Sequence, residues 1–267
     1  MSEYIMPVRP QNSNKGTFGK VLNIAGSDNF IGAAYLSTLA ALKVGAGYAA
    51  LAADKAVIDT VSKLLPEAVY ISRENAIKSF KNYTVLLIGC GLGREKRTVS
   101  DFKKFINLAQ KYRLPTVIDA DGLNILAKFD SFKLTQNTII TPHPMEAARL
   151  LGVDSILNDL KFAAKELSKK YKCIVVLKNH RTIICKEERI FVNQYGNSAL
   201  AKAGTGDILA GIISGLLAQK MEPFEAAKLG VYLHSRAGEI ASQDLTEYSV
   251  LASELVKYFP AAIKELL

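Results

Sequence analysis

Residues 193–211 combine a loop of small residues, one carboxylate and the start of an apolar helix. Gly204, Thr205 and Gly206 stand directly before Asp207 in this segment. Glycines let backbone N–H groups approach a ligand closely, and the first turn of a helix leaves several of these donors unpaired. Because the helix dipole adds positive partial charge at the same place, the segment is typical of a phosphate-binding loop.

The carboxylate of Asp207 has two interpretations. An aspartate weakens an anion site electrostatically, unless it serves as a base that removes a proton from an attacking hydroxyl. Alternatively, it caps the start of the helix, and the glycines only turn the chain. The spacing alone leaves both interpretations open.

The composition is that of an ordinary globular protein. The 267 residues are 49% hydrophobic and can bury a substantial core. No apolar run approaches the roughly 18–20 residues of a membrane span, and the N-terminal residues lack the order of a signal peptide. The three cysteines, Cys90, Cys173 and Cys185, are an odd number without metal-type spacing. We therefore expect reduced, structural thiols in a cytoplasmic protein.

The net charge of +9 favours anionic partners. The basic residues are spread along the whole chain, with no long Lys/Arg block and no tryptophan. A solvated surface and a phosphorylated small-molecule ligand explain this charge at least as well as nucleic-acid binding does, so we expect no nucleic-acid partner.

Apolar runs alternate with helical patterns along nearly the whole chain. This alternation predicts an α/β fold, with a mainly parallel central sheet covered by helices on both faces. No linker or repeat divides the chain, so we expect residues 15–267 to form one domain behind an extended lead-in of residues 1–14. The expected strands are 20–25, 48–53, 85–88, 115–119, 138–141, 174–177, 183–185 and 189–192, and the expected helices include 31–44, 55–64, 99–112, 205–219, 224–241 and 249–265.

Several unusual sequences follow the expected strands, where ligands collect in open α/β sheets. Residues 89–93 predict a close-approach glycine turn, although they match neither a P-loop nor a dinucleotide fingerprint. Residues 119–124 place two acids and an amide at a strand end. The alternative is that Asp121 caps a helix that has Asn124 in its first turn.

Prolines on both sides stiffen the backbone around His143, which suits hydrogen bonding or stacking on a ligand; a surface turn histidine is the alternative. Glu146 is a candidate for reaching a magnesium ion through water, or it only complements a helix dipole. Lys178 leaves a buried strand toward nucleotide phosphates, although hairpin turns often carry lysine anyway. For His234, within a helix, we expect packing or an interhelical hydrogen bond.

Together and in this order, these segments resemble the NAD(P)H-hydrate dehydratases, ribokinase-like enzymes that repair hydrated nicotinamide cofactors. The resemblance runs from about Lys15 to the C-terminus, and it implies a ribokinase-like three-layer sandwich. It rests on residues 14–27, 32–34, 46–47, 89–93, 119–124, 141–146, 177–178 and 204–207.

The chain also departs from the family pattern. The family usually has proline where Cys90 stands, and glycine at the places of Met145 and Asn179. We expect Met145 to narrow the part of the site that holds the substrate, and Asn179 to weaken the contacts of the turn at Lys178 with the nucleotide. An epimerase domain is often fused ahead of the dehydratase in the family; we expect this chain to lack it and an NAD(P)H-hydrate epimerase to be a separate partner.

The resemblance implies a phosphoryl transfer followed by an elimination. With Mg²⁺, a nucleotide gives its terminal phosphoryl group to the hydroxyl of (6S)-NADHX or NADPHX, and loss of phosphate regenerates NADH or NADPH. Asp207 would take the hydroxyl proton, while Gly204, Thr205 and Gly206 would stabilise the transferring group. Family members use ADP or ATP; we expect ADP because the chain is short and free-standing. We also expect a homo-oligomer.

The resemblance also implies two sets of binding residues. The substrate set contains Ala33, Ala34, Gly91, Gly93, Asn124, His143 and Asp207, and the nucleotide set contains Lys178, Asn179, His180, Arg181, Thr182 and Gly206.

Two other functions share these motifs. A ribokinase-like kinase for a vitamin precursor of the hydroxymethylpyrimidine, thiazole or pyridoxal type would use the same loop but release a stable phosphorylated product. A nucleotide sensor would bind without turnover. The turn at His143 and residues 119–124 favour the dehydratase over the kinase.

Overall fold

The computed structural model of the protein describes residues 4–129, 132 and 134–267. Within these residues, nine strands form one sheet in the order β3-β2-β1-β4-β5-β6-β7-β8-β9. Neighbouring strands from β3 to β7 are parallel, and β8 and β9 form an antiparallel hairpin beside β7, which confirms the prediction of a mainly parallel sheet. The strands are β1 (Lys20–Ile24), β2 (Tyr48–Ala52), β3 (Val69–Ile71), β4 (Val85–Ile88), β5 (Thr116–Ile118), β6 (Thr138–Ile140), β7 (Ile174–Leu177), β8 (Ile183–Lys186) and β9 (Arg189–Val192).

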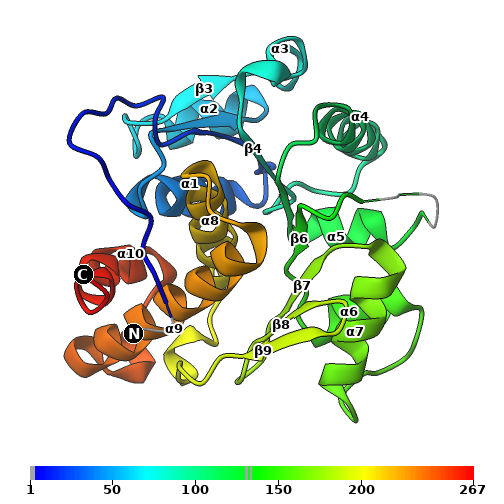
Figure 1. Ribbon diagram of the computed structural model, residues 1–267. Helices are drawn as coiled ribbons and strands as arrows, with labels where there is room; N and C mark the ends of the chain where they lie inside the picture. The colour runs from blue at the N-terminus through cyan, green and yellow to red at the C-terminus, as the bar shows by residue number, and fades with distance from the viewer. Residues whose placement is uncertain (1–3, 130–131, 133) are drawn as a thin grey trace.

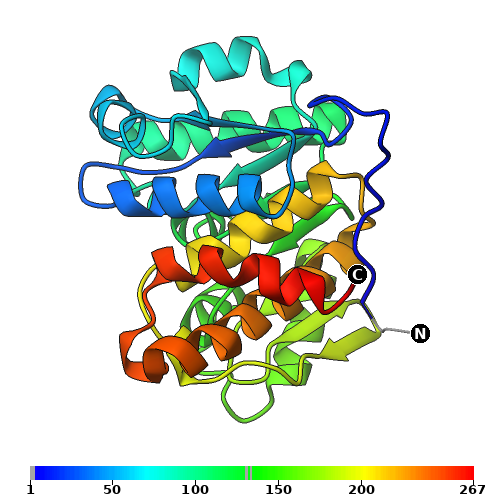
Figure 2. The same cartoon turned by 90° about the vertical axis from the view of Figure 1, so that its left-hand side faces the viewer.

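Helices cover both faces of this sheet (Figure 1), and alternate strand residues enter two separate cores: Val21 enters one and Leu22 the other. The first core lies between the sheet and the helices that face the viewer in Figure 2, and α2 also packs on it. Its helices are α1 (Ile31–Lys43), α2 (Lys55–Val61), α8 (Thr205–Ala218), α9 (Pro223–Ser249) and α10 (Ala252–Lys264). The second core lies under α3 (Arg73–Lys78), α4 (Lys96–Tyr112), α5 (Asp121–Leu126), α6 (Pro144–Leu151) and α7 (Leu160–Tyr171).

Helix α8 lies unusually close to α1. A β-carbon at Gly211 would come within 2.3 Å of the Ser37 carbonyl oxygen, and one at Gly215 within 2.5 Å of the Ala41 carbonyl oxygen. Only glycine fits at such separations, so the two glycines let the helix backbones touch. The close packing fixes the direction of α8, whose first turn faces the carboxyl ends of β5 and β7.

Some elements differ from the sequence-based expectation. The expected elements did not include β3 and α3, because a three-residue strand and a six-residue helix carry little periodicity. The helix expected at 224–241 extends as α9 to Ser249, across a kink at Thr246, whose φ is 63°. Two short 3₁₀ turns, Phe80–Asn82 and Ser198–Leu200, complete the fold.

The lead-in contains no helix or strand from residue 4 to residue 14; residues 1–3 of the predicted lead-in lie outside the described residues. Tyr4 is nevertheless buried, with its ring stacked on Tyr232 at a centroid distance of 4.1 Å. Arg9 donates hydrogen bonds to the Gly45 carbonyl oxygen and to Gln219. Across residues 4–129, 132 and 134–267, no helix combines the length and the apolar character needed to cross a membrane.

Candidate functional site

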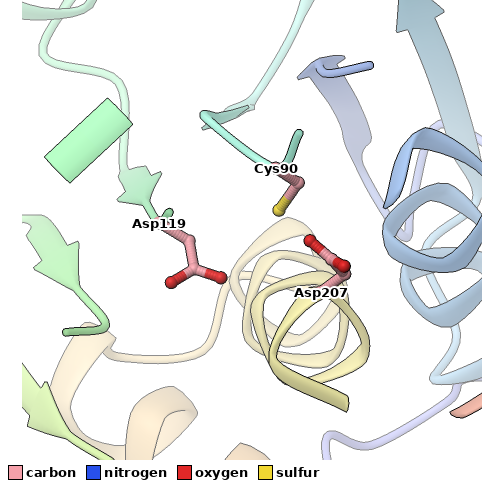
Figure 3. Close-up of side chains that lie close together, drawn as sticks. All are labelled: Cys90, Asp119 and Asp207. Atoms are coloured by element: carbon pink, nitrogen blue, oxygen red, sulfur yellow. The ribbon is translucent and has the colours of Figure 1, made fainter. Parts of the chain in front are cut away.

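Three side chains meet where β4, β5 and α8 converge. Figure 3 shows Cys90, Asp119 and Asp207 directed toward one another from the ends of the two strands and from the first turn of the helix. The Cys90 Sγ atom and one carboxylate oxygen of each aspartate all lie within 4.8 Å of one another. Cys90 is a free, buried thiol, as expected, but the fold brings it against the carboxylate predicted to be the base.

The start of α8 has open hydrogen-bond donors. Gly204 is the N-cap residue with φ of 89°, a conformation that favours glycine, and no side chain caps the helix. Within the described part of the chain, the N–H groups of Gly204, Gly206 and Asp207 make no hydrogen bond, and the Thr205 N–H has only a 3.4 Å contact with the Lys202 carbonyl oxygen. Three amides are therefore available to an anion, and the interpretation of Asp207 as a cap is wrong.

Asp207 carries an unusual proton affinity. Burial first, and then the charge of Asp119, raise the pKa of its carboxyl from 3.8 to about 7, while the hydrogen bond with Cys90 and the charge of Lys178 partly offset the shift. A carboxylate that exchanges its proton near neutral pH is suited to general base catalysis.

Lys178 lies between the carboxylates of Asp119 and Glu146. Its Nζ atom lies 2.8 Å from an Asp119 oxygen and 3.8 Å from a Glu146 oxygen. Burial alone would lower the pKa of Lys178, but the two carboxylates outweigh it, and the pKa is raised. A β-carbon on Gly206 would lie 3.4 Å from the same nitrogen, which places the ammonium group beside the open amides of α8.

Glu146 and His143 form the start of α6. The His143 Nδ1 atom accepts the N–H groups of Met145 and Glu146, and a Glu146 carboxylate oxygen accepts the N–H of His143 at 2.9 Å. This reciprocal pair is a capping box, and Pro144 supplies the first helical position. Burial raises the pKa of Glu146 to about 7, against the opposing charge of Lys178. Burial and the charge of Lys178 lower the pKa of His143.

Two cavities of about 420 Å³ and 410 Å³ meet over the first turn of α8 and share Lys178, Thr205 and Gly206 in their walls. The deeper one runs between the β7–β8 loop and α9 and is mostly apolar, and Tyr195, Leu200 and Val231 help to line it. The more open one is lined by the ionisable groups Asp119, His143, Glu146, Lys178, Lys202 and Asp207.

The predicted nucleotide residues gather mainly at the deeper cavity. Lys178, Asn179, His180, Thr182 and Gly206 line it. Arg181 does not; its guanidinium group donates to the carbonyl oxygen of Gln194.

The predicted substrate residues divide into three groups. His143 and Asp207 line the open cavity. Gly91 contacts the side of α1 that carries Ala33, because a β-carbon on Gly91 would lie 2.8 Å from that of Ala33. The Gly93 N–H donates to Asp121, the Asn124 amide oxygen accepts from Arg149, and Ala34 has no exposed surface. Ala34 therefore packs in the core and has no surface to offer a ligand.

Sequence reasoning left out of the predicted site two residues that the structure places there. Asp119 directly follows β5 and could have been selected by the same strand-end rule that singled out its segment. Cys90 stood out only as a departure from the proline of the family pattern, and no role was predicted for it because a buried thiol after a strand is ordinary. His234 behaves as expected: its Nε2 atom lies 2.9 Å from the Thr205 carbonyl oxygen on α8, and burial lowers its pKa to about 4.

The layered architecture, with an uncapped helix start at the carboxyl ends of the parallel strands, defines a ribokinase-like α/β protein. A ribokinase-like superfamily protein from Enterococcus faecalis superposes with a TM-score of 0.91 at 31% identity, covering 98% of this chain and 92% of that one. A hydroxyethylthiazole kinase from Pyrococcus horikoshii, at 14% identity and a TM-score of 0.69, shares the fold.

The chain belongs to the NAD(P)H-hydrate dehydratase family, whose model matches residues 21–261. The ADP-dependent (S)-NAD(P)H-hydrate dehydratase of Bacillus subtilis is 33% identical over 97% of this chain and 94% of its own length. The bifunctional NAD(P)H-hydrate repair enzyme of Moorella thermoacetica is 35% identical over 98% of this chain, which spans 52% of that protein. The chain thus corresponds to about half of the bifunctional relatives.

Proposed function

We propose that this protein converts (6S)-NADHX and NADPHX back to NADH and NADPH, with ADP as the phosphoryl donor. One observation carries the proposal: the open amides of Gly204, Gly206 and Asp207 lie beside a carboxylate whose pKa is about 7, in the wall of a cavity. The family match covers all of these residues. The curated relatives from Bacillus subtilis and Listeria monocytogenes are named as ADP-dependent dehydratases of this kind.

The two joined cavities suit two ligands. The deeper, apolar cavity fits the base and ribose of a nucleotide, and its phosphates then reach Lys178 and the amide of Gly206. The open cavity, which holds the Asp207 carboxylate, receives the hydrated nicotinamide ring. A Bacillus subtilis structure that matches this chain with a TM-score of 0.88 was co-crystallised with ATP/Mg²⁺, which supports a nucleotide in this protein as well.

The reaction follows from this placement. Asp207 accepts the proton of the ring hydroxyl while the hydroxyl oxygen attacks the terminal phosphorus of ADP, and AMP departs. The open amides of α8 donate hydrogen bonds to the phosphoryl oxygens and so stabilise the negative charge that develops there in the transition state. The nitrogen lone pair of the ring then expels phosphate to leave an iminium ion, and loss of a proton from the neighbouring ring carbon restores the dihydronicotinamide. The balance is ADP plus hydrate giving AMP, phosphate and the reduced cofactor.

The donor set of the open cavity is compatible with Mg²⁺. Magnesium keeps several waters and takes few protein carboxylates, and Glu146 is a buried carboxylate in the cavity wall. One Glu146 oxygen is already engaged by the His143 N–H, so we propose that Glu146 orients a metal-bound water and does not bind the ion directly. When bound, the ion would neutralise phosphate charge.

The three buried free thiols agree with a reducing cytoplasmic compartment. Residues 15–267 are proposed to act as one domain, and homo-oligomer formation and a separate epimerase partner stay predictions from the family resemblance.

Incubation of the purified protein with ADP, Mg²⁺ and the hydrate of NADH tests the proposal. We expect the near-ultraviolet absorbance of NADH to return, with one AMP and one phosphate formed for each NADH. ATP in place of ADP identifies the preferred donor. Accumulation of a stable phosphorylated alcohol from a vitamin precursor, without NADH recovery, would instead support the kinase. Nucleotide binding without any product would support a sensor.

A further inference from the structure

The proposed reaction does not use the thiol of Cys90, although this thiol lies against the base. Cys90 has no exposed surface, and Figure 3 shows its Sγ atom directed toward the two aspartates. Its carbonyl oxygen accepts the Gly26 N–H at 2.9 Å, and its neighbours Gly89 and Gly91 have φ of 125° and 58°, conformations that favour glycine. The backbone that carries the thiol is therefore held in place against the start of α8.

A thiol in these surroundings can only be a donor. Burial first, and then the carboxylates of Asp207 and Asp119, raise the pKa of Cys90 well above its ordinary value. The thiol therefore keeps its proton at physiological pH and can donate a hydrogen bond to a carboxylate. The Cys90 Sγ atom lies within 4.8 Å of a carboxylate oxygen of Asp207, and a hydrogen bond from the thiol to that carboxylate would favour its ionised form.

We propose that Cys90 is a positioning residue for the base: its buried S–H group donates a hydrogen bond to the Asp207 carboxylate and orients it beside the open amides of α8. This inference rests on the proposed function, because it takes Asp207 as the base of the reaction. It adds a neutral donor to a site where every other group that acts on Asp207 is charged.

The charged groups around Asp207 act in opposite directions. Asp119 and Asp121 oppose ionisation of Asp207, whereas Lys178 favours it while pairing with Asp119 at 2.8 Å. From the helices packed near the start of α8, Leu36 of α1 and Ala252 of α10 face Gly204, and neither titrates. The remaining charged or titratable side chains in the wall of the open cavity, which Asp207 also lines, are His143, Glu146 and Lys202.

The test compares Cys90→Ala with Cys90→Ser by the pH dependence of kcat/KM for NADH-hydrate dehydration. Cys90→Ala removes the donor, so we expect the acid limb of the profile to move to higher pH by about one unit. kcat/KM should then fall about tenfold at pH values below the limb and change little well above it. Cys90→Ser keeps a hydroxyl donor, so its acid limb stays near that of the parent. A Cys90→Ala profile that superposes on the parent, or one lowered equally at every pH, would overturn the inference.

Cys173→Ala is the matched control. Cys173 is also buried, but it precedes β7 and so lies at the opposite edge of the sheet from Asp207. Its removal should leave the acid limb unchanged even if it lowers stability. Two further measurements separate the hypotheses: a parent enzyme that does not recover NADH from its hydrate would mean that the proposed function has failed, and a fully active Asp207→Asn would overturn the inference by removing Asp207 as the base. An inactive Asp207→Asn with an unshifted Cys90→Ala profile would remove only the role of Cys90.

Infrared spectroscopy gives a readout that needs no turnover. The difference spectrum between the parent and Cys90→Ala isolates the S–H stretching band of Cys90 from those of the other two thiols. We expect this band at the low frequency of a donor to a carboxylate, and a shift to higher frequency in Asp207→Asn. A band that is insensitive to Asp207→Asn would contradict the hydrogen bond itself.

Discussion

The starts of α6 and α8 border the same open cavity, but they use their backbone donors in opposite ways. At α6, Pro144 has no N–H group, and His143 accepts the next two amides. At α8, Gly204 has no side chain to accept anything, and three amides stay open. The first amides of α6 are therefore paired within the protein, whereas those of α8 are free to bind a ligand.

This difference assigns separate tasks to two motifs that look equally suited to a ligand. The closed start of α6 holds its own backbone rigidly and contributes only side chains, His143 and Glu146, to the cavity. The open start of α8 contributes backbone donors and the carboxylate of Asp207. A helix dipole is common to both, so the dipole alone does not make an anion site; the donors must also be unpaired.

The largest expected effect comes from Asp207→Asn. The substitution keeps the shape and the open amides of α8 but removes the base. We expect turnover to fall by about 10²–10⁴-fold, while ADP affinity is largely kept. Steady-state kinetics and calorimetric titration with ADP measure the two quantities. Retained turnover would show that the carboxylate is not the base.

The same substitution should stabilise the fold in a pH-dependent way. The pKa of Asp207 is raised from 3.8 to about 7 in the folded protein, so between these values the folded state binds more protons than the unfolded state. The contribution of Asp207 to stability is therefore lost as the pH rises through this window. Above pH 7 we expect Asp207→Asn to be more stable than the parent by on the order of 2–4 kcal/mol, and below about pH 4 the two should be equal.

Urea unfolding across this pH range measures the effect. Asp154→Asn, which changes an exposed aspartate, is the control and should follow the parent at every pH. An Asp207→Asn variant less stable than the parent at pH 8 would mean that the ionised carboxylate is well solvated.

Gly206→Ala tests the open donors directly. The new β-carbon would lie 3.4 Å from the Lys178 Nζ atom and 3.8 Å from an Asp119 oxygen, so the fold can accommodate it, and alanine favours a helix. The methyl group covers the space above the amides, and we expect about a 10–100-fold loss of kcat/KM with unchanged or higher Tm. Gly204→Ala should instead lower Tm, because Gly204 has φ of 89° and its β-carbon would lie 2.6 Å from a Leu36 carbon. Unchanged activity in a stable Gly206→Ala variant would place the phosphoryl group elsewhere.

The smallest expected effect is that of His143→Ala at the closed helix start. Removal of the cap leaves the amides of Met145 and Glu146 without an acceptor, so we expect a loss of about 1 kcal/mol in the free energy of unfolding. His143→Asn, which keeps a good capping side chain, should recover most of this loss. Denaturant titration distinguishes the two variants, and a His143→Ala protein as stable as the parent would show that the capping bonds contribute little.

Much of the fold could be predicted from the sequence, because its strands are short apolar runs and its long helices are strongly patterned. The stretch 85–88 and the helix that begins at Thr205 lie where the pattern places them. The elements that escaped, β3 and α3, are too short for periodicity to emerge. At the site, the loop before Asp207 was recognisable, because open donors at a glycine-rich helix start are a local property of the chain. Arg181 and Asn124 could not be judged in this way, because their partners, Gln194 and Arg149, are remote in sequence.

The sequence by itself determined the alternation of strands and helices and the glycine-rich helix start at Gly204, since each depends on neighbouring residues only, but it left open whether Asp207 caps that helix. The tertiary structure alone decided that Lys178 pairs with Asp119, 59 residues away, and that Cys90 meets Asp207. It also decided the proton affinity of Asp207, because burial and a second carboxylate from another strand set that value. Charges and desolvation act through space, and only the packing of α8 against the sheet brings these groups within range.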